Sequence, residues 1–126
     1  MINDTLKASG TLVLVLTDEH GNVKQREETN LVVDTGLAFI ASRMKDTTMA
    51  AMSHMAVAET ARVGLVSTSI VTTNVANDAI EYMATFAPGT GTGALTEAAL
   101  FNAGAAGTML SRTVFAVINK GVLDSL

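Results

Sequence analysis

"TFAPGTGTGALTEAALFNAGAAGTML", residues Thr85–Leu110, is the stretch on which the choice between an α/β fold and an all-β fold depends. It follows a run that is typical of a β-strand, and its glycines stand before "ALTEAALFNA", which could begin a helix. A strand, a glycine turn and a helix N-terminus together form a phosphate site in nucleotide-binding folds. If the glycines only let the chain turn, the same stretch is a long connection between two strands.

The spacing of the glycines argues against a nucleotide site. A Rossmann turn requires G-x-G-x-x-G, but Ala94 and Thr96 stand where the third glycine should fall. A P-loop requires Gly-Lys-Ser/Thr, and no lysine follows the glycines. Glu97 would also bring a negative charge to the phosphate, with no cation to offset it in sequence before Arg112. We therefore interpret the glycines as positions that permit positive φ in a long hairpin connection: Gly89, Gly91 and Gly93.

The amino-terminal part of the chain predicts a β-hairpin. "TLVLVLT" (Thr11–Thr17) is rich in leucine and valine, "DEHGN" (Asp18–Asn22) is typical of a turn, and "VKQREE" (Val23–Glu28) is polar and alternating. We expect the first strand to be buried on both faces. We expect the second to be a solvent-facing edge strand whose charges discourage unwanted pairing.

The segment "NLVVDTGLAFIASRMKD" (Asn30–Asp46) changes period partway through. Leu31–Val33 fits a strand. The apolar residues that follow recur at i, i+3, i+4 and i+7, which predicts one face of a helix: Leu37, Ile40, Ala41 and Met44. Asp34 or Thr35 is expected to cap its start, and the last turn carries two basic residues that suit the helix dipole, Arg43 and Lys45.

The rest of the chain is dominated by β patterns. We expect a methionine-rich loop followed by a strand from His54. Further β-rich runs are Ala61–Val71, Ala79–Phe86 and Thr108–Asn119, and the turn Thr72–Asp78 separates the first two. Because only one convincing helix is found, β-α-β alternation is absent from the pattern. The predicted fold is a single domain over residues 1–126, mainly β: an antiparallel β-sandwich or jelly-roll-like domain with one short α-helix.

Composition excludes several classes of function. The formal net charge is −4, and the eight Lys and Arg residues are scattered, so we expect no direct contact with nucleic acid. No apolar run approaches the length of a membrane span, and we expect no membrane association. The chain has no cysteine and only 4% aromatic residues. A core built from small side chains makes oligomerisation attractive, because a partner can cover apolar surface.

No residue pattern predicts catalysis, a metal or a cofactor. His20 and His54 lack the H-x-H or H-x-x-x-H companions of metal sites, and the serines lack a G-x-S-x-G nucleophile elbow. We therefore expect a protein that is not an enzyme, with no cofactor and no metal. Six residues remain as candidates for subunit contacts or a structural hydrogen-bond network: Met52, Met55, Glu97, Phe101, Asn102 and Arg112.

Five segments in a fixed order resemble a family of small virion proteins of tailed bacteriophages. The most specific part is "GTGTGALTEA…FNA…GTMLSRTVF…INKG". The resemblance runs from Asn30 onward, over "NLVVDTGLAFIASRM" (Asn30–Met44), "MSHMAV" (Met52–Val57), "ARV" (Ala61–Val63), "YMATFAPGTGTGALTEAALFNA" (Tyr82–Ala103) and "GTMLSRTVFAVINKGVLDSL" (Gly107–Leu126).

The resemblance implies a structural protein made in the host cytoplasm and located in the virion. The leading hypothesis is a capsid decoration or cement protein that binds the major capsid protein, copies of itself, or both, as a homo-oligomer. A tail, neck or fibre component is the alternative, and a small ligand-binding module is a third hypothesis of a different class.

The chain departs from the family pattern in two places. It lacks a longer Gly/Thr-rich loop after "MSHMAV", and it lacks a β-rich strand after "DSL". A sheet without its last strand has an unpaired edge. We therefore expect a neighbouring subunit to pair with that edge.

Overall fold

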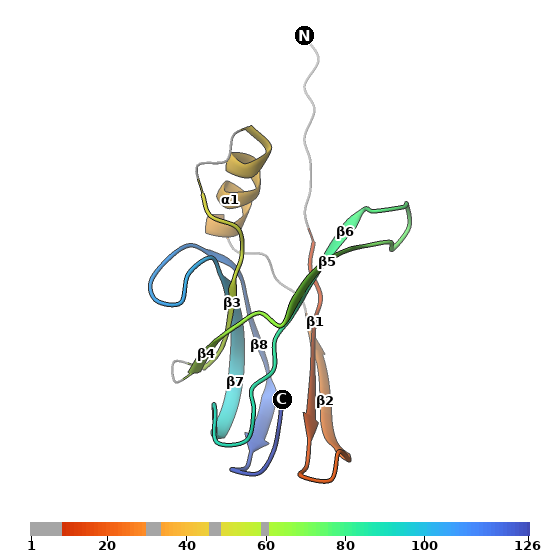
Figure 1. The fold of residues 1–126 in the computed structure, drawn as a ribbon, viewed down its shortest axis with the longest axis vertical. Helices are drawn as coiled ribbons and strands as arrows, with labels where there is room; N and C mark the ends of the chain where they lie inside the picture. The colour runs from red at the N-terminus through yellow and green to blue at the C-terminus, as the bar shows by residue number, and fades with distance from the viewer. Residues whose placement is uncertain (1–8, 30–33, 46–48, 59–60) are drawn as a thin grey trace.

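The computed structural model describes residues 9–29, 34–45, 49–58 and 61–126, which contain eight strands and one helix (Figure 1). In chain order these are β1 (Leu12–Thr17), β2 (Val23–Thr29), α1 (Asp34–Lys45), β3 (His54–Val57), β4 (Ala61–Gly64), β5 (Ser67–Val71), β6 (Ala79–Met83), β7 (Gly93–Phe101) and β8 (Met109–Lys120).

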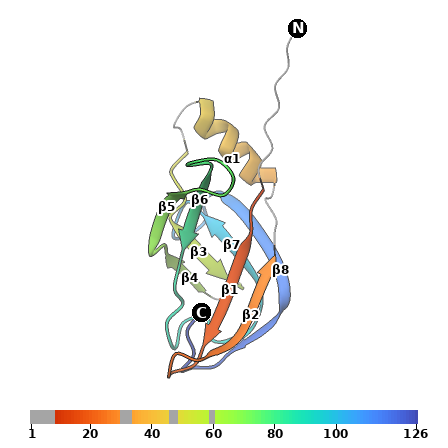
Figure 2. The ribbon, with the colours of Figure 1, turned by 90° about the vertical axis from the view of Figure 1, so that its right-hand side faces the viewer.

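The strands form three antiparallel sheets. The largest has the order β4-β3-β7-β8, and the hairpins β1–β2 and β5–β6 form two smaller sheets. Figure 2 views the molecule with β1 and β2 in front of the larger sheet, and Figure 1 shows the two layers side by side. β2 also packs against β8, and α1 packs against the same strand. The prediction of a mainly β, sandwich-like antiparallel fold with a short helix is confirmed.

The stretch Thr85–Leu110 is not a hairpin connection, and this prediction is wrong. It contains β7, which lies in the interior of the larger sheet between β3 and β8. Each glycine before this strand has positive φ, as expected: 81° at Gly89, 64° at Gly91 and 132° at Gly93. The glycines therefore turn the chain into a central strand, and neither a helix nor a long loop follows them.

The predicted hairpin of β1 and β2 is confirmed, but β1 is buried on one face only. Leu14 and Leu16 are 5% and 2% exposed, whereas Val13 and Val15 are 45% and 37% exposed. β2 in turn is less exposed than expected, because it packs on β8, where Gln25 Nε2 donates to the Val117 carbonyl at 2.9 Å. The apolar run of β1 is thus compatible with an amphipathic strand that leaves valines uncovered.

The predicted helix is present, but its expected apolar face is only partly buried, since Ile40 packs against the buried cluster that contains Phe39. Phe39 is buried, while Leu37 and Met44 are exposed. Gly36 is buried and sits against the backbone of Leu110 in β8, which sets the face that α1 turns toward the sheet. The expected strand at residues 31–33 and the side chains of the two expected cap residues lie outside the described residues.

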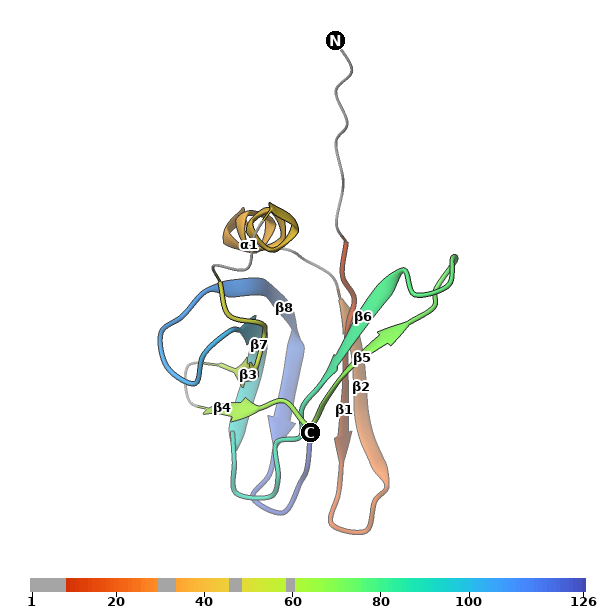
Figure 3. The ribbon, with the colours of Figure 1, turned by 45° about the horizontal axis from the view of Figure 1, so that its top comes forward.

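The β-rich run at residues 61–71 divides into two strands that belong to different sheets. β4 is an edge of the larger sheet, whereas β5 pairs with β6. Leu65 and Val66 lie between them, and the Leu65 N–H donates to the Ser53 carbonyl at 2.9 Å. Figure 3 shows the β5–β6 hairpin projecting from the body beside β1, with its turn at the outer end.

Two clusters of buried residues form the core. The larger lies between β1 and the four-stranded sheet and contains Leu14, Leu16, Val57, Phe86, Leu95, Ala98, Phe115 and Ile118. The smaller lies beneath α1 and is centred on Phe39, Met52 and Leu100. Met49 and Met55 pack against the smaller cluster, so the methionines fill gaps in the core.

Candidate functional site

The outer face of the four-stranded sheet carries a row of four residues in register, one from each strand. Ala56 of β3 pairs with Arg62 of β4 and with Ala99 of β7, and Ala99 pairs with Arg112 of β8. Two arginines therefore flank two alanines. Because the central side chains are small, the face has a shallow groove of about 600 Å³, which Glu97 and Phe101 also line.

Both arginines of this face already have partners. The Arg62 guanidinium lies 3.6 Å from the centre of the Phe101 ring. It also donates to the carbonyls of Ala103 and Ala106, at 3.0 and 2.8 Å. Arg112 forms an ion pair with Glu97 on the adjacent strand. The arginines thus fix the loop after β7 and link β7 to β8, instead of presenting two unpaired cations to an anionic ligand.

Asn102 holds the turn between β7 and β8. Its Oδ1 accepts from the Thr108 N–H at 2.6 Å, and its Nδ2 donates to the Ala50 carbonyl at 3.3 Å. The structure therefore brings together four of the six candidate residues, on β7, β8 and their turn: Glu97, Phe101, Asn102 and Arg112. The two methionine candidates do not line this groove, because Met52 is buried beneath α1 and Met55 packs against both core clusters.

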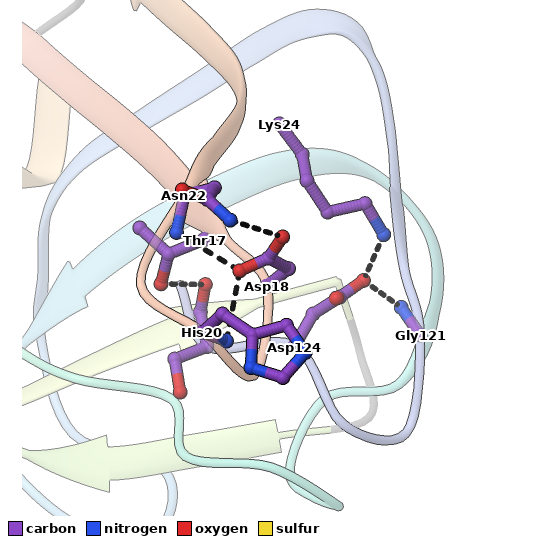
Figure 4. Close-up of polar contacts among 8 residues, drawn as sticks. Thr17, Asp18, His20, Asn22, Lys24, Gly121 and Asp124 are labelled. Atoms are coloured by element: carbon purple, nitrogen blue, oxygen red, sulfur yellow. Dashed lines mark hydrogen bonds and ion pairs between the residues drawn. The ribbon is translucent and has the colours of Figure 1, made fainter.

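A second polar cluster, which the sequence did not reveal, lies where the β1–β2 turn meets the carboxyl end of the chain (Figure 4). Asp124 Oδ2 accepts from Lys24 Nζ and from the Gly121 N–H, both at 2.7 Å. The hydrogen bond from Lys24 is the main reason that the pKa of Asp124 lies below its usual value, and the Gly121 N–H adds to it. This cluster joins segments that are 100 residues apart in the chain.

Asp18 organises the turn at the other side of this cluster. Its Oδ1 accepts from the N–H groups of His20 and Asn22, each at 2.9 Å. The hydrogen bond from the Asn22 N–H is the largest cause of the lowered pKa of the Asp18 carboxyl. The turn chemistry of "DEHGN" was the signal for this residue, whereas no local signal marks Asp124.

A lysine lies close to the glycine turn in the structure, although it is distant from the glycines in the sequence. Lys120 pairs with Gly93, and its Nζ donates to the Ala87 carbonyl at 3.0 Å. The residue is only 2% exposed, and burial lowers its pKa while Asp124 raises it. Lys120 therefore ties the turn before β7 to the end of β8, and its ammonium is enclosed within the protein.

The described residues contain no group of three His, Cys, Asp or Glu side chains that could hold a metal ion. Within the same residues, every buried side-chain nitrogen and oxygen has a hydrogen-bond partner. No helix in the described part of the chain has the length and apolar character that a membrane span requires.

The projecting hairpin carries some of the exposed large apolar side chains of the described residues. Ile70 of β5 and Ile80 of β6 are directly paired, and they are 67% and 55% exposed. Val75, in the turn between the two strands, is also exposed. A cross-strand pair of isoleucines places both side chains on one face of the hairpin. That face is suited to packing against another protein surface.

No family model, curated protein or solved structure matches the chain.

Proposed function

We propose that this chain is a non-enzymatic structural subunit of a tailed-bacteriophage virion, and specifically a capsid decoration or cement protein. The observation that carries the proposal is the β5–β6 hairpin, which projects from the body with the paired side chains of Ile70 and Ile80 uncovered. The ordered sequence segments from Asn30 onward support the phage setting.

An isolated two-stranded hairpin is marginally stable in water. β5 and β6 pair only with each other among the described strands, so packing on a neighbour would stabilise them. Burying the exposed face of one large aliphatic side chain contributes about 1.5–3 kcal/mol at most. Two isoleucines therefore give a modest single contact.

A modest contact is sufficient when it is repeated. In a symmetric shell each copy can contact more than one neighbour, and linked contacts raise the effective affinity without any new chemistry. The protein would bind across junctions between major capsid protein subunits and hold them together by buried area. This mode of action requires no cofactor, no metal and no catalytic residue.

Electron microscopy of particles that contain this chain tests the location. The chain would carry a short affinity tag, and gold-labelled antibody against the tag would be counted on heads and tails. Label distributed over the head supports the proposal. Label confined to the tail, the neck or fibres would support the alternative virion location, and particles without label would overturn both.

The variant Ile70→Ser with Ile80→Ser, expressed with the same tag, tests the hairpin itself. We expect it to fold and to be lost from particles, because the uncovered apolar face is removed. Val122→Ser is the matched control, since Val122 is similarly exposed but lies in the carboxyl-terminal turn. Full incorporation of the double variant would show that the hairpin face makes no essential contact.

A further inference from the structure

The two last residues of the chain lie between the two hairpins. Ser125 exchanges two backbone hydrogen bonds with Thr17 of β1, at 2.9 and 3.0 Å. Leu126 exchanges two with Phe86, which follows β6, at 2.8 and 3.0 Å. Adjacent residues of one segment thus bond to both sides, so the hairpins are one strand apart at this level. The bridging segment runs antiparallel to β1.

Beyond Leu126 the space between the hairpins is an apolar groove of about 380 Å³. Val13 and Val15 of β1 line one side of it, and Met83 and Ala84 line the other. Val13, Val15 and Met83 are all exposed. Figure 3 shows β1 and the β5–β6 hairpin diverging upward from the carboxyl terminus, which lies at their foot.

The groove is also edged by backbone groups that can pair with a strand. Alternate residues of a strand direct their N–H and C=O groups to the same edge. Val13 and Val15 therefore direct their N–H and C=O groups to the edge of β1 on which Thr17 bonds to Ser125. No strand of the described residues pairs with β1 along this edge, since its partners are β2 and, at Thr17, Ser125.

We infer that this groove accepts a β-strand, and that its occupant is the segment of residues 1–8 of a second copy, exchanged reciprocally between two copies. The inference goes beyond the proposed function, because it concerns how two copies pair and holds for any particle that contains them. The added strand would continue the line of Ser125 and Leu126. It would add a third strand to the β1–β2 sheet, in the layer that faces β4-β3-β7-β8.

The direction of the chain before β1 favours exchange over insertion into the same copy. Ser9, Gly10 and Thr11 precede β1 without forming a turn. A strand that continues the direction of Ser125 and Leu126 runs antiparallel to β1. A segment could enter its own groove in that direction only if the chain reversed at these three residues, so exchange with a second copy is the arrangement that needs no reversal.

Two-fold symmetry satisfies this geometry in both copies at once. The segment of one copy would pair with β1 of the other, and the reverse, so two extended strands would lie antiparallel along their whole length. Eight extended residues span about 26 Å, and the five-residue edge from Leu12 to Leu16 spans about 16 Å. Ile2 and Leu6 have even spacing and lie on one face of such a strand, where they can contact the apolar walls.

The molar mass of the full chain in solution, measured by light scattering after size exclusion, tests the inference. We expect the molar mass of a dimer for the full chain, and the molar mass of a monomer after residues 1–8 are removed. The full chain with Val15→Pro should also have the molar mass of a monomer. The substitution removes an N–H from the open edge of β1 and leaves the edge bonded to β2 intact. Circular dichroism and the melting temperature establish that each variant folds.

A synthetic peptide of residues 1–8 provides the second readout. We expect it to bind the truncated chain and to bind at least tenfold more weakly when Val15→Pro is added, or when its own Ile2 and Leu6 are replaced by aspartate. A full chain that is monomeric at micromolar concentration would overturn the inference. A truncated chain that is still dimeric would overturn it as well, and so would peptide binding that Val15→Pro does not weaken.

Discussion

Gly36 decides how closely α1 can approach β8. A Cβ at this position would fall on the backbone carbonyl of Leu110, far inside van der Waals contact. Helix propensity alone makes Gly→Ala stabilising by about 1 kcal/mol, whereas overpacking against a backbone costs about 1–3 kcal/mol. We expect Gly36→Ala to lower the free energy of unfolding, measured by urea denaturation.

Gly64→Ala is the matched control for this prediction. No heavy atom lies within 4 Å of the added Cβ at Gly64, and a surface substitution of this kind changes stability by about 0.5 kcal/mol or less. A more stable Gly36→Ala protein would show that α1 does not rest on β8 at this contact.

Asp124 makes stability depend on pH at the acid side. Its pKa in the folded protein lies below the usual value of 3.8, chiefly because Lys24 donates a hydrogen bond to the carboxylate. The stabilisation from the ionised carboxylate is therefore fully present above pH 3.8 and is lost as the pH falls toward the lower folded pKa. We expect Asp124→Asn to reduce the loss of stability below pH 3.8, measured by thermal melts at several pH values.

Glu19→Gln is the control, because Glu19 is exposed in the β1–β2 turn and lies outside the Asp124 contacts. It should leave the acid dependence almost unchanged. An Asp124→Asn protein with the same acid dependence as the parent would contradict the assigned role of this carboxylate.

Local sequence chemistry identified some of these residues and not others. Asp18 could be recognised because its partners lie two and four residues away in the same turn. Asp124 could not, because Lys24 and Gly121 reach it from separate segments. The buried face of α1 was also missed, since Gly36 carries no apolar side chain and its role depends on the position of β8.

Asp78 organises the turn of the projecting hairpin. Its carboxylate accepts from the N–H groups of Thr73, Asn74 and Val75 at 2.7–3.0 Å, and from the Thr73 hydroxyl at 2.8 Å. These bonds hold the pKa of Asp78 far below its usual range. We expect Asp78→Ala to speed amide hydrogen exchange in the turn and in β5 and β6, because the hairpin loses the element that closes it.

The amides of β7 and β8 provide the internal control in the same experiment, because these strands belong to a separate sheet. Their exchange should be unchanged. Faster exchange throughout the molecule would show that the hairpin is part of one cooperative unit with the body, and unchanged exchange in the turn would show that Asp78 does not hold it.

β7 was missed in the sequence because its pattern is not that of a regular strand. A bulge between Leu95 and Glu97 shifts the register against β8. Buried residues therefore recur as Leu95, Ala98 and Leu100, and the first interval is that of a helix. β1, β2 and β8 lack this irregular spacing over most of their length, and the sequence predicted them as strands from period and composition.

The sandwich-like class of the whole molecule followed from counting β-rich runs and finding one helix. The pairing order β4-β3-β7-β8 could not follow from that count, because it depends on contacts between residues far apart in the chain. The sequence predicted an unpaired sheet edge without assigning it to a strand, and the groove beside β1 could not be located from that prediction. Its position required knowing that Ser125 and Leu126 lie between Thr17 and Phe86.

At the scale of the proposed assembly, the uncovered isoleucines of the hairpin and the open edge of β1 would give each copy two distinct contact surfaces. Decoration of a shell requires at least one contact to the shell, and a second contact between copies would make attachment cooperative. A tail or neck ring would use the same surfaces in far fewer copies, so the number of copies per particle distinguishes the two locations.

Quantitative mass spectrometry of purified particles, with the major capsid protein as internal standard, measures that number directly. We expect hundreds of copies of this chain per particle, in a fixed ratio to the major capsid protein. A dozen copies or fewer would contradict the decoration role, and absence from particles that package DNA normally would contradict a place in the virion.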